Sequence, residues 1–277
     1  MECVNKYFIA DDELVVETEK FPEYNNSNGM KLYEVVRVIE GIPLFIDEHI
    51  KRFHSSAKKS GNELFVSDDD IMKAIKKLIK ENECYMGNVK IVFCLSEIKH
   101  FLCYFVEHKY PDQEMYLNGV KTLTYKATRP NPEVKAINED LRDQVSKLLE
   151  ENPDVYEILL LNSDKEITEG SKSNVLFVKG NRIITAPMRT ILKGITRDKI
   201  FEICEELGFV TEERMVNREE VHEFEACFLT GTSPKVLPIS YINDIKFDHK
   251  NKIMLKIKEK FEELVDKYIL DAKQNDL

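Results

Sequence analysis

The order of apolar and polar positions near the start of the chain predicts a strand, a tight turn and a helix. Residues 32–39 are rich in β-branched side chains, and the Glu-Gly pair at 40–41 predicts a turn into an apolar run over 42–46. Apolar positions at helical spacing follow. We therefore expect a helix that has Asp47 as its N-cap and that ends at Gly61.

The alternation then continues as far as a polar break. Ser67 is a good N-cap for a second helix, because three aspartates after it favour the positive end of the helix dipole. Two apolar strands are expected between residues 89 and 107. The polar, proline-containing stretch 108–114 interrupts the pattern and predicts a domain boundary, with one domain over 1–112 and another over 113–277.

After this break, strands and helices resume without strict alternation of one strand and one helix. Gly208 stands where the C-cap glycine of a helix belongs. The mixture favours an α+β fold over a doubly wound parallel sheet. The elements expected here are strands near 119–125, 155–161, 174–179, 182–185, 209–216 and 225–230, and helices near 139–151, 196–207 and 252–272.

Composition and charge narrow the class of protein. The hydrophobic fraction of 43% and the charged fraction of 32% are typical of a soluble globular protein, and the net charge of -10 argues against binding to nucleic acid. No apolar run reaches the roughly 18 residues of a membrane span, and the first residues lack the pattern of a signal peptide. The six scattered cysteines fit a reducing cytoplasm, and none has a histidine at the spacing of a metal site.

Several polar clusters stand at the ends of predicted strands and helices, where loops place working residues. Each has an ordinary interpretation: Arg52 as a surface charge, Lys135 as one of 40 lysines and arginines, Glu169 as a turn residue. The helix start at 194–196 is either a cap or an anion site, and the turn at 230–232 could offer N–H and hydroxyl donors. The clusters cover residues 47–52, 129–138, 167–174, 192–197 and 230–233.

Six segments taken together carry a pattern that none of them carries alone. They are Tyr33-Glu-Val-Val-Arg-Val, Pro43-Leu-Phe-Ile-Asp-Glu-His-Ile-Lys-Arg-Phe-His-Ser-Ser-Ala57, Tyr156-Glu-Ile-Leu, Glu169-Gly-Ser-Lys-Ser-Asn-Val-Leu-Phe, Ile191-Leu-Lys-Gly-Ile-Thr-Arg197 and Phe228-Leu-Thr-Gly-Thr-Ser-Pro-Lys-Val-Leu-Pro-Ile. This ordered set resembles the class IV aminotransferases, which include branched-chain and D-amino-acid aminotransferases and 4-amino-4-deoxychorismate lyase. The resemblance implies a two-domain α+β fold of fold-type IV, with a smaller N-terminal domain and a larger C-terminal domain that has a barrel-like sheet. It also implies pyridoxal 5'-phosphate as cofactor and a homodimer.

By this resemblance, Lys135 is the lysine that holds the cofactor, and Lys147 is its nearest rival. Lys135 is preferred because it precedes Glu169 by 34 residues, a separation that the family uses. Glu169 resembles the carboxylate that pairs with the pyridine nitrogen of the cofactor. An arginine and a helix N-terminus suit its phosphate. The other residues expected at the cofactor are Arg52, Ser171, Asn174, Ile195, Thr196 and Thr232, and those expected at the substrate are Tyr33, Ser233 and His100.

The substrate is less clearly indicated. Several members carry an Arg-Gly pair on or just after the strand that corresponds to residues 89–96, and they use it on the substrate carboxylate, whereas this sequence has no such pair. Lys99 and His100 are the cations nearby, with a hairpin-tip charge as their ordinary interpretation. The leading hypothesis is amino transfer between a branched-chain or D-amino acid and a 2-oxo acid. The alternatives are an aminodeoxychorismate lyase that releases pyruvate and a non-catalytic homologue.

Overall fold

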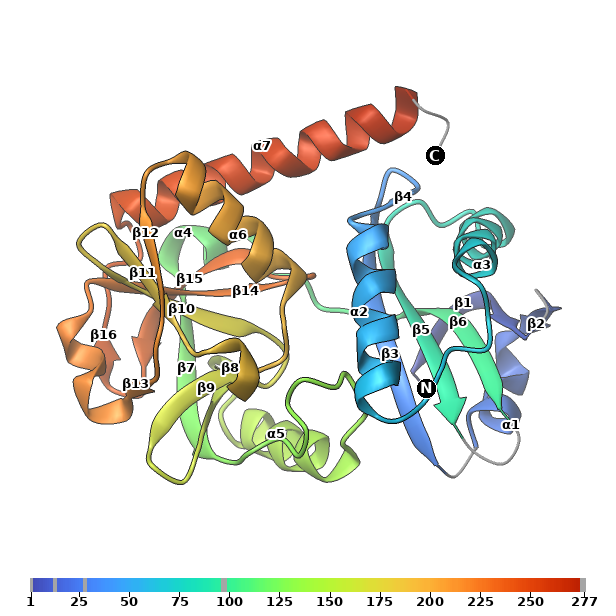
Figure 1. Cartoon of the computed structure of the whole chain (residues 1–277), viewed down its shortest axis with the longest axis horizontal. Coiled ribbons are helices and arrows are strands. Elements are labelled where there is room, and N and C mark those ends of the chain that lie inside the picture. The colour runs from blue at the N-terminus through green and yellow to red at the C-terminus, as the bar shows by residue number, and fades with distance from the viewer. Residues whose placement is uncertain (1, 12–13, 27–28, 96–98, 275–277) are drawn as a thin grey trace. The chain divides into compact units, whose positions relative to one another are not determined.

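The chain divides into two compact units, each built around its own sheet. The computed structural model describes residues 2–11, 14–26, 29–95 and 99–274. The first unit comprises Met1–Lys109, Val134–Ile137 and Val265–Leu277, and the second comprises Tyr110–Glu133 and Asn138–Leu264. The chain therefore leaves the first unit twice, after Lys109 and after Ile137, and returns to it twice (Figure 1).

The first unit is a six-stranded antiparallel sheet in the order β2-β1-β6-β5-β3-β4. In chain order its elements are β1 (Cys3–Ala10), β2 (Leu14–Glu17), the 3-10 helix η1 (Thr18–Lys20), α1 (Phe21–Asn25), β3 (Met30–Ile39), β4 (Ile42–Pro43), α2 (Ile46–Lys59), α3 (Asp68–Glu81), β5 (Gly87–Leu95) and β6 (His100–Val106). Ser67 caps α3 as expected, because its hydroxyl accepts a hydrogen bond from the N–H of Asp70 at 3.2 Å.

Strand β3 shows why this sheet has two different faces. Its residues alternate between buried and partly exposed, as a strand with one covered face requires. Leu32, Val36 and Val38 pack with helices α2 and α3, and each such buried aliphatic side chain contributes about 1.5–3 kcal/mol. The opposite face carries Tyr33 and packs with α1. The face that carries Tyr33 is called the tyrosine face below.

The segment 134–137 extends this sheet. The N–H of Tyr33 donates to the carbonyl of Lys135, and the N–H of Ile137 donates to the carbonyl of Lys31, both at 3.0 Å. Leu32 and Ala136 form an antiparallel bridge between these two bonds. The segment thus pairs with the edge of β3 that β5 leaves open, and this pairing fixes where Lys135 lies.

The start of α2 differs from the sequence prediction. Asp47 does not cap this helix; the cap position belongs to Phe45, whose backbone is left-handed with a φ of 51°. The conformation is costly for a non-glycine residue, by about 1–2 kcal/mol, and the buried Phe45 ring offsets the cost by packing against Tyr268 at 4.9 Å between centroids. Asp47 lies exposed in the first turn.

The second unit is a mixed ten-stranded sheet in the order β12-β11-β10-β14-β15-β7-β8-β9-β13, with β16 paired to β15. Its elements are α4 (Gln113–Asn118), β7 (Val120–Lys126), α5 (Glu139–Glu151), β8 (Val155–Leu161), β9 (Glu166–Gly170), β10 (Asn174–Lys179), β11 (Arg182–Thr185), η2 (Met188–Thr190), α6 (Ile195–Glu206), β12 (Val210–Glu213), β13 (Val216–Asn217), η3 (Arg218–Glu223), β14 (Ala226–Gly231), β15 (Lys235–Ile242) and β16 (Ile245–Lys246). Helix α7 (Lys252–Gln274) begins in this unit and ends in the first.

Most predicted elements are confirmed. The elements that were not predicted include the short helices α1 and α4, the 3-10 helices, and several strands whose sequences hide their type. Strand β9 carries glutamate at positions 166 and 169, and β15 contains Pro238 and begins at Lys235 with a positive φ of 53°. Within the described residues, no helix combines the length and the apolar character that crossing a membrane requires.

Candidate functional site

Lys135 lies on the tyrosine face of the first unit. Its ammonium nitrogen is 4.9 Å from the centroid of the Tyr33 ring, and its backbone N–H donates to the hydroxyl of Ser56 at 3.2 Å. The backbone is thus anchored to β3 and to α2, while the side chain lies over an aromatic ring. The rival, Lys147, is exposed on α5. The two lysines therefore differ in kind, because only Lys135 has an ordered and partly buried setting.

Arg52 pairs with a carboxylate that sequence reasoning did not single out. Its Nε and one terminal nitrogen donate to the two oxygens of Glu34 at 2.7 and 2.6 Å, a bidentate ion pair. His49 Nδ1 lies 2.7 Å from Glu34 as well. Glu34 is fully buried, and it occupies one position of the apolar series Leu32, Val36 and Val38 on β3. A lone charged residue in an apolar series indicates that the charge has a buried partner. This pattern could have identified Glu34 from the sequence.

Burial and charge shift the pKa values of this cluster in known directions. Burial raises the pKa of Glu34, but the guanidinium of Arg52 and the hydrogen bond from His49 outweigh it, so the pKa lies well below the usual range. Burial lowers the pKa of His49, and this outweighs the opposite effect of Glu34. Glu34 is accordingly ionised and His49 neutral near pH 7.

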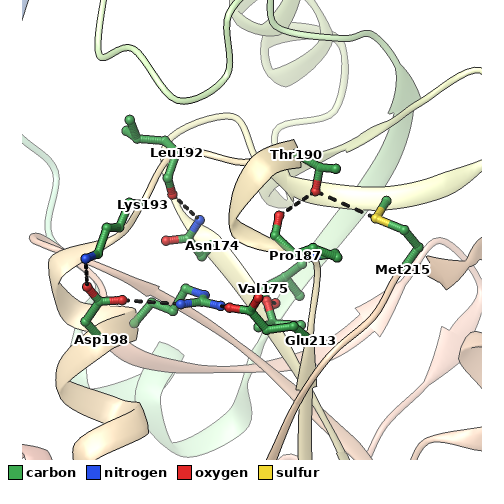
Figure 2. Close-up of polar contacts among 11 residues, drawn as sticks. Asn174, Val175, Pro187, Thr190, Leu192, Lys193, Asp198, Glu213 and Met215 are labelled. Carbon is green, nitrogen blue, oxygen red and sulfur yellow. Dashed lines mark hydrogen bonds and ion pairs between the residues drawn. The ribbon is translucent and has the colours of Figure 1, made fainter. Parts of the chain in front are cut away.

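In the second unit, Glu169 at the end of β9 is held by several donors. Its carboxylate forms an ion pair with Nε of Arg129 at 2.8 Å and accepts the N–H of Leu192 at 3.1 Å. The amide of Asn174 lies 3.4 Å from the same carboxylate and donates to the carbonyl of Leu192 at 3.1 Å, as Figure 2 shows for the second bond. Glu169 is only 3% exposed, so its orientation is fixed. Nothing in the sequence pointed to Arg129 as its partner.

The start of α6 is open to an anion. No side chain caps this helix, whereas α3, α4 and α5 each have a capping side chain. A Cβ on Gly194 would lie 1.9 Å from Oδ1 of Asn174, so any other residue would have to displace that side chain or the helix start. Thr230 lies opposite Asn174 on the neighbouring strand and therefore points to the same side of the sheet. Its buried hydroxyl has no hydrogen-bond partner among the described residues. The first-turn N–H groups and this hydroxyl suit a phosphate.

A charged network encloses the first turn of α6. The buried guanidinium of Arg197 pairs with Glu213 and with Asp198. Figure 2 shows the ion pair of Lys193 with Asp198, at 3.3 Å. The guanidinium also lies over the Phe201 ring, 4.2 Å from its centroid. Arg197 therefore ties α6 to β12.

The turn after Glu169 is organised by a second buried carboxylate. Glu157 accepts hydrogen bonds from the hydroxyl of Ser171 at 2.5 Å and from that of Ser173 at 3.1 Å. The carbonyl of Ser171 accepts a hydrogen bond from Arg129. Ser171, expected at the cofactor, thus directs its hydroxyl to Glu157 and belongs to the frame that holds Glu169.

The remaining expected residues lie on two separate parts of the fold. Thr232 and Ser233 are partly buried in the turn between β14 and β15. His100 begins β6, and its Nδ1 is 3.3 Å from Asp11. The hairpin tip at 96–98 lies outside the described residues. Within each unit the structure brings together one set: Lys135 with Tyr33 in the first, and Glu169 with Asn174 and the start of α6 in the second.

Comparison with known proteins gives a consistent result. A sequence model of the family described as amino-transferase class IV matches residues 31–242. The D-alanine aminotransferase of Bacillus licheniformis is 31% identical over 228 residues, which cover 78% of this chain and 80% of that protein. The aminodeoxychorismate lyase of Bacillus subtilis is 26% identical over 234 residues, which cover 79% of this chain and 80% of that protein.

A solved structure shares the fold. The branched-chain amino acid aminotransferase of Escherichia coli superposes with a TM-score of 0.83 at 20% identity, and the match covers 95% of each chain. This similarity confirms the expected two-domain α+β fold.

Proposed function

The chain belongs to the class IV aminotransferases, enzymes that depend on pyridoxal 5'-phosphate, and from this premise we propose that it transfers an amino group between an amino acid and a 2-oxo acid. The substrates that we favour are a branched-chain or D-amino acid and its acceptor. We further propose that the protein is a cytoplasmic homodimer. Light scattering after gel filtration would measure its oligomeric state.

The residues present fit the cofactor. The start of α6 offers uncapped N–H groups, and the buried hydroxyl of Thr230 has no hydrogen-bond partner among the residues that the structure describes. A phosphate would satisfy both. Glu169 offers a fixed carboxylate for the ring nitrogen, with Arg129 behind it. We propose Ile195, Thr196 and Thr232 for the phosphate and Lys135 for the covalent bond.

When bound, the cofactor supplies the electron sink for the carbanion at the α-carbon of the substrate. The chain supplies position and proton transfer. The amine of Lys135 can take the proton from the α-carbon and return it. Arg52 is the family's expected phosphate partner, yet its guanidinium is already paired with Glu34. We propose that this pairing fixes the direction in which the remaining guanidinium donors of Arg52 point.

The observation that carries this proposal is the setting of Lys135. Its carbonyl accepts a hydrogen bond from the N–H of Tyr33 on β3, and its ammonium lies against the Tyr33 ring. A lysine on a rigid element next to an aromatic wall can hold a reacting group in one orientation. An exposed lysine on a helix, such as Lys147, has no such wall to hold a reacting group in one orientation.

Replacing each lysine by alanine tests this assignment. Lys135→Ala should abolish the visible absorbance of lysine-bound cofactor and lower turnover by roughly 100-fold or more, because the covalent anchor and the proton carrier are one amine. Lys147→Ala is the matched control and should change neither. Absorbance spectra, borohydride fixation of cofactor to the chain and steady-state rates are the measurements. Loss of fixation in Lys147→Ala, with Lys135→Ala normal, would overturn the assignment.

The lyase reaction is the second candidate, because the chain is also similar to an aminodeoxychorismate lyase. A panel of L- and D-amino donors, with 2-oxo acids and with aminodeoxychorismate, separates the two. Release of pyruvate from aminodeoxychorismate without an amino acceptor would favour the lyase. Exchange with an amino-acid donor would favour the aminotransferase. A protein that binds cofactor and turns over no substrate in the panel would be the non-catalytic homologue.

A further inference from the structure

Glu157 is a buried carboxylate that the proposed reaction does not yet use. It is the third residue of β8 and is 4% exposed. Four neutral groups donate to its two oxygens. Oε1 accepts the N–H groups of Ile158 and Ser171, both at 3.1 Å, and the hydroxyl of Ser171 at 2.5 Å. Oε2 accepts the hydroxyl of Ser173 at 3.1 Å. Two serines of one turn are thus bound to one side chain.

The number of donors explains why a carboxylate suits this position. A carboxylate has about four lone-pair sites, and the four donors fill them. Glutamine has the same shape, but only its carbonyl oxygen accepts, and its NH2 group would turn the Ser173 hydroxyl from a donor into an acceptor. A buried carboxylate is costly unless it is fully hydrogen-bonded, and a fully bonded buried network is rigid. Glu157 therefore holds its donors in one arrangement.

Ser171 links Glu157 to Arg129. Its N–H is shared between Glu157 and the carbonyl of Ile158, which is 2.9 Å away, and its hydroxyl donates to Glu157. Its carbonyl accepts a hydrogen bond from a terminal nitrogen of Arg129. The Nε of the same guanidinium forms the ion pair with Glu169 at 2.8 Å. One residue therefore separates the buried carboxylate from the guanidinium that holds Glu169.

Glu157 also packs against the residue that follows Glu169. A Cβ on Gly170 would lie 2.3 Å from the hydroxyl oxygen of Ser173 and 3.2 Å from Cγ of Glu157. The N–H of Gly170 donates to the carbonyl of Ser173 at 2.8 Å. The turn is therefore closed tightly around the Glu157 side chain, which contacts the surroundings of Glu169 both along the chain and through Arg129.

The partners of Glu169 divide between its two oxygens. The N–H of Leu192 and the amide of Asn174 lie at Oε2, at 3.1 and 3.4 Å, and Arg129 lies at Oε1. The contact with Arg129 thus opposes rotation of the carboxylate about Oε2. Rotation matters because a hydrogen bond weakens steeply when its donor–hydrogen–acceptor angle falls below about 120°. The direction in which Glu169 offers its carboxylate therefore depends on where Arg129 lies.

We propose that Glu157 is a positioning residue for the contact between Glu169 and the ring nitrogen of the cofactor, and that it acts through Ser171 and Arg129. The inference rests on the proposed function, because Glu169 is the carboxylate proposed for that nitrogen. A carboxylate keeps a ring nitrogen protonated only when it faces that nitrogen. Loss of Glu157 should therefore weaken this one contact and leave the phosphate site and the bond to Lys135 as they are.

The test compares pyridoxal 5'-phosphate with its carbocyclic analogue, in which a C–H group replaces the ring nitrogen. Fluorescence titration after removal of the resident cofactor gives both dissociation constants. Glu157→Gln should weaken binding of pyridoxal 5'-phosphate about tenfold and change that of the analogue by less than about twofold, because only the contact to the ring nitrogen is lost. Equal weakening of both ligands would mean a general structural role and would overturn the proposal. Glu150→Gln, at an exposed position on α5, is the matched control and should change neither.

The protonation of the ring nitrogen is a second readout, and it needs no turnover. In the holoenzyme, NMR of an isotope-labelled ring nitrogen gives the pH at which this nitrogen loses its proton. That pH should be about one unit lower in Glu157→Gln, because an about tenfold weaker contact with the carboxylate lowers the pKa of the nitrogen by this amount. The same pH in both proteins would contradict the proposal.

A double variant tests the route through Arg129. Arg129→Lys keeps a positive charge near Glu169 but lacks the fork that also reaches the Ser171 carbonyl. It should by itself lower the preference for pyridoxal 5'-phosphate over the analogue. Adding Glu157→Gln should then change this preference by less than about twofold, since both residues act on one contact. Additive losses would show that Glu157 acts by another route, against the proposal.

Ser173→Ala decides the question if Glu157→Gln does not fold. It removes one donor to Glu157 and keeps every carboxylate, so the preference for pyridoxal 5'-phosphate over the analogue should fall about threefold. No fall would count against the proposal. The proposed function can fail separately: a protein that binds cofactor and turns over no substrate still gives both dissociation constants.

Discussion

At the scale of single residues, two opposite effects act on the ionisation of Glu34 in its cluster with Arg52 and His49. Full burial disfavours its charge, and the bidentate contact with Arg52 favours it. Such a pair contributes little net stability, yet breaking it by removing one partner costs about 3–5 kcal/mol. The cluster therefore fixes the orientation of Arg52 more than it stabilises the fold. His49 is the member of this cluster whose ordinary pKa lies nearest to neutral pH, and burial lowers that pKa in the folded protein.

His49 should make the protein less stable as pH falls below neutral. Its folded pKa is lowered, so the unfolded chain, with a histidine pKa of about 6.5, binds more protons than the folded one. The contribution is therefore present above about pH 6.5 and is lost as pH falls below it, with a slope of at most about 1.4 kcal/mol per pH unit. Urea unfolding between pH 5 and pH 8 measures it.

Replacement of His49 isolates this effect. His49→Gln keeps a donor for Glu34 and removes the titration, so its free energy of unfolding should fall less between pH 7 and pH 5 than that of the unchanged protein. His54→Gln is the matched control, since His54 is half exposed on the same helix beside Asp68. Equal slopes in the unchanged protein and in His49→Gln would contradict the assignment.

At the scale of elements, the contact between β10 and the start of α6 positions the anion site. Gly194 precedes the helix, and Asn174 of β10 fills the space where its side chain would be. Asn174 also donates to Leu192, just before the helix. The position of the helix start thus depends on one glycine and one amide.

Adding a methyl group at Gly194 should weaken cofactor binding. Its backbone φ of -80° accepts alanine, so the cost is steric: a Cβ 1.9 Å from Asn174 must displace that side chain or the helix. We expect Gly194→Ala to raise the dissociation constant of pyridoxal 5'-phosphate at least about tenfold, with a loss of about 1–3 kcal/mol in stability. Cofactor titration by fluorescence and thermal unfolding measure both.

The double variant shows whether the clash is the cause. In Asn174→Ala the space beside position 194 is free, so adding Gly194→Ala should then cost much less than it does in the unchanged protein. Additive losses in the two single variants would show that Gly194 acts through something other than this contact.

At the scale of the whole molecule, neither unit is made from one continuous segment. The first unit contains residues 134–137, which pair with the edge of β3, and the end of α7, where Tyr268 packs on Phe45. Lys273 near the end of α7 also pairs with Glu40. The domain boundary at 112–113 stays a prediction, and the return of these two segments gives a way to examine it.

A fragment of residues 1–112 should fold poorly by itself. It lacks the partner for the edge of β3 and the ring that covers Phe45, so an open strand edge and an apolar side chain are exposed. We expect self-association and loss of a cooperative unfolding transition. Gel filtration and circular dichroism would show both. The full chain with Tyr268→Ala is the comparison that isolates the helix contact, and a monomeric, cooperatively unfolding fragment would refute the expectation.

Alternation and helical spacing were sufficient to place most of the elements. The buried series on β3 and the serine cap of α3 follow from local rules, and both are confirmed. Strand β9 was not predicted because glutamates such as Glu166 and Glu169 are more common in loops than in strands. The cap of α2 was not predicted because Phe45 takes a left-handed backbone, and its contact with Tyr268 joins residues far apart in the sequence.

The sequence by itself determined the family and therefore the cofactor, because six ordered motifs survive in spacing and residue type. It also named Lys135 and Glu169 as the residues to examine. Only the tertiary structure decided how the buried charges pair: Arg129 with Glu169, Glu34 with Arg52, and Glu2 with Lys90 beside Tyr33. These partners are 15 or more residues apart along the chain. The local pattern of apolar and polar residues does not predict these pairs, because the partners of a buried charge are close in space and distant in sequence.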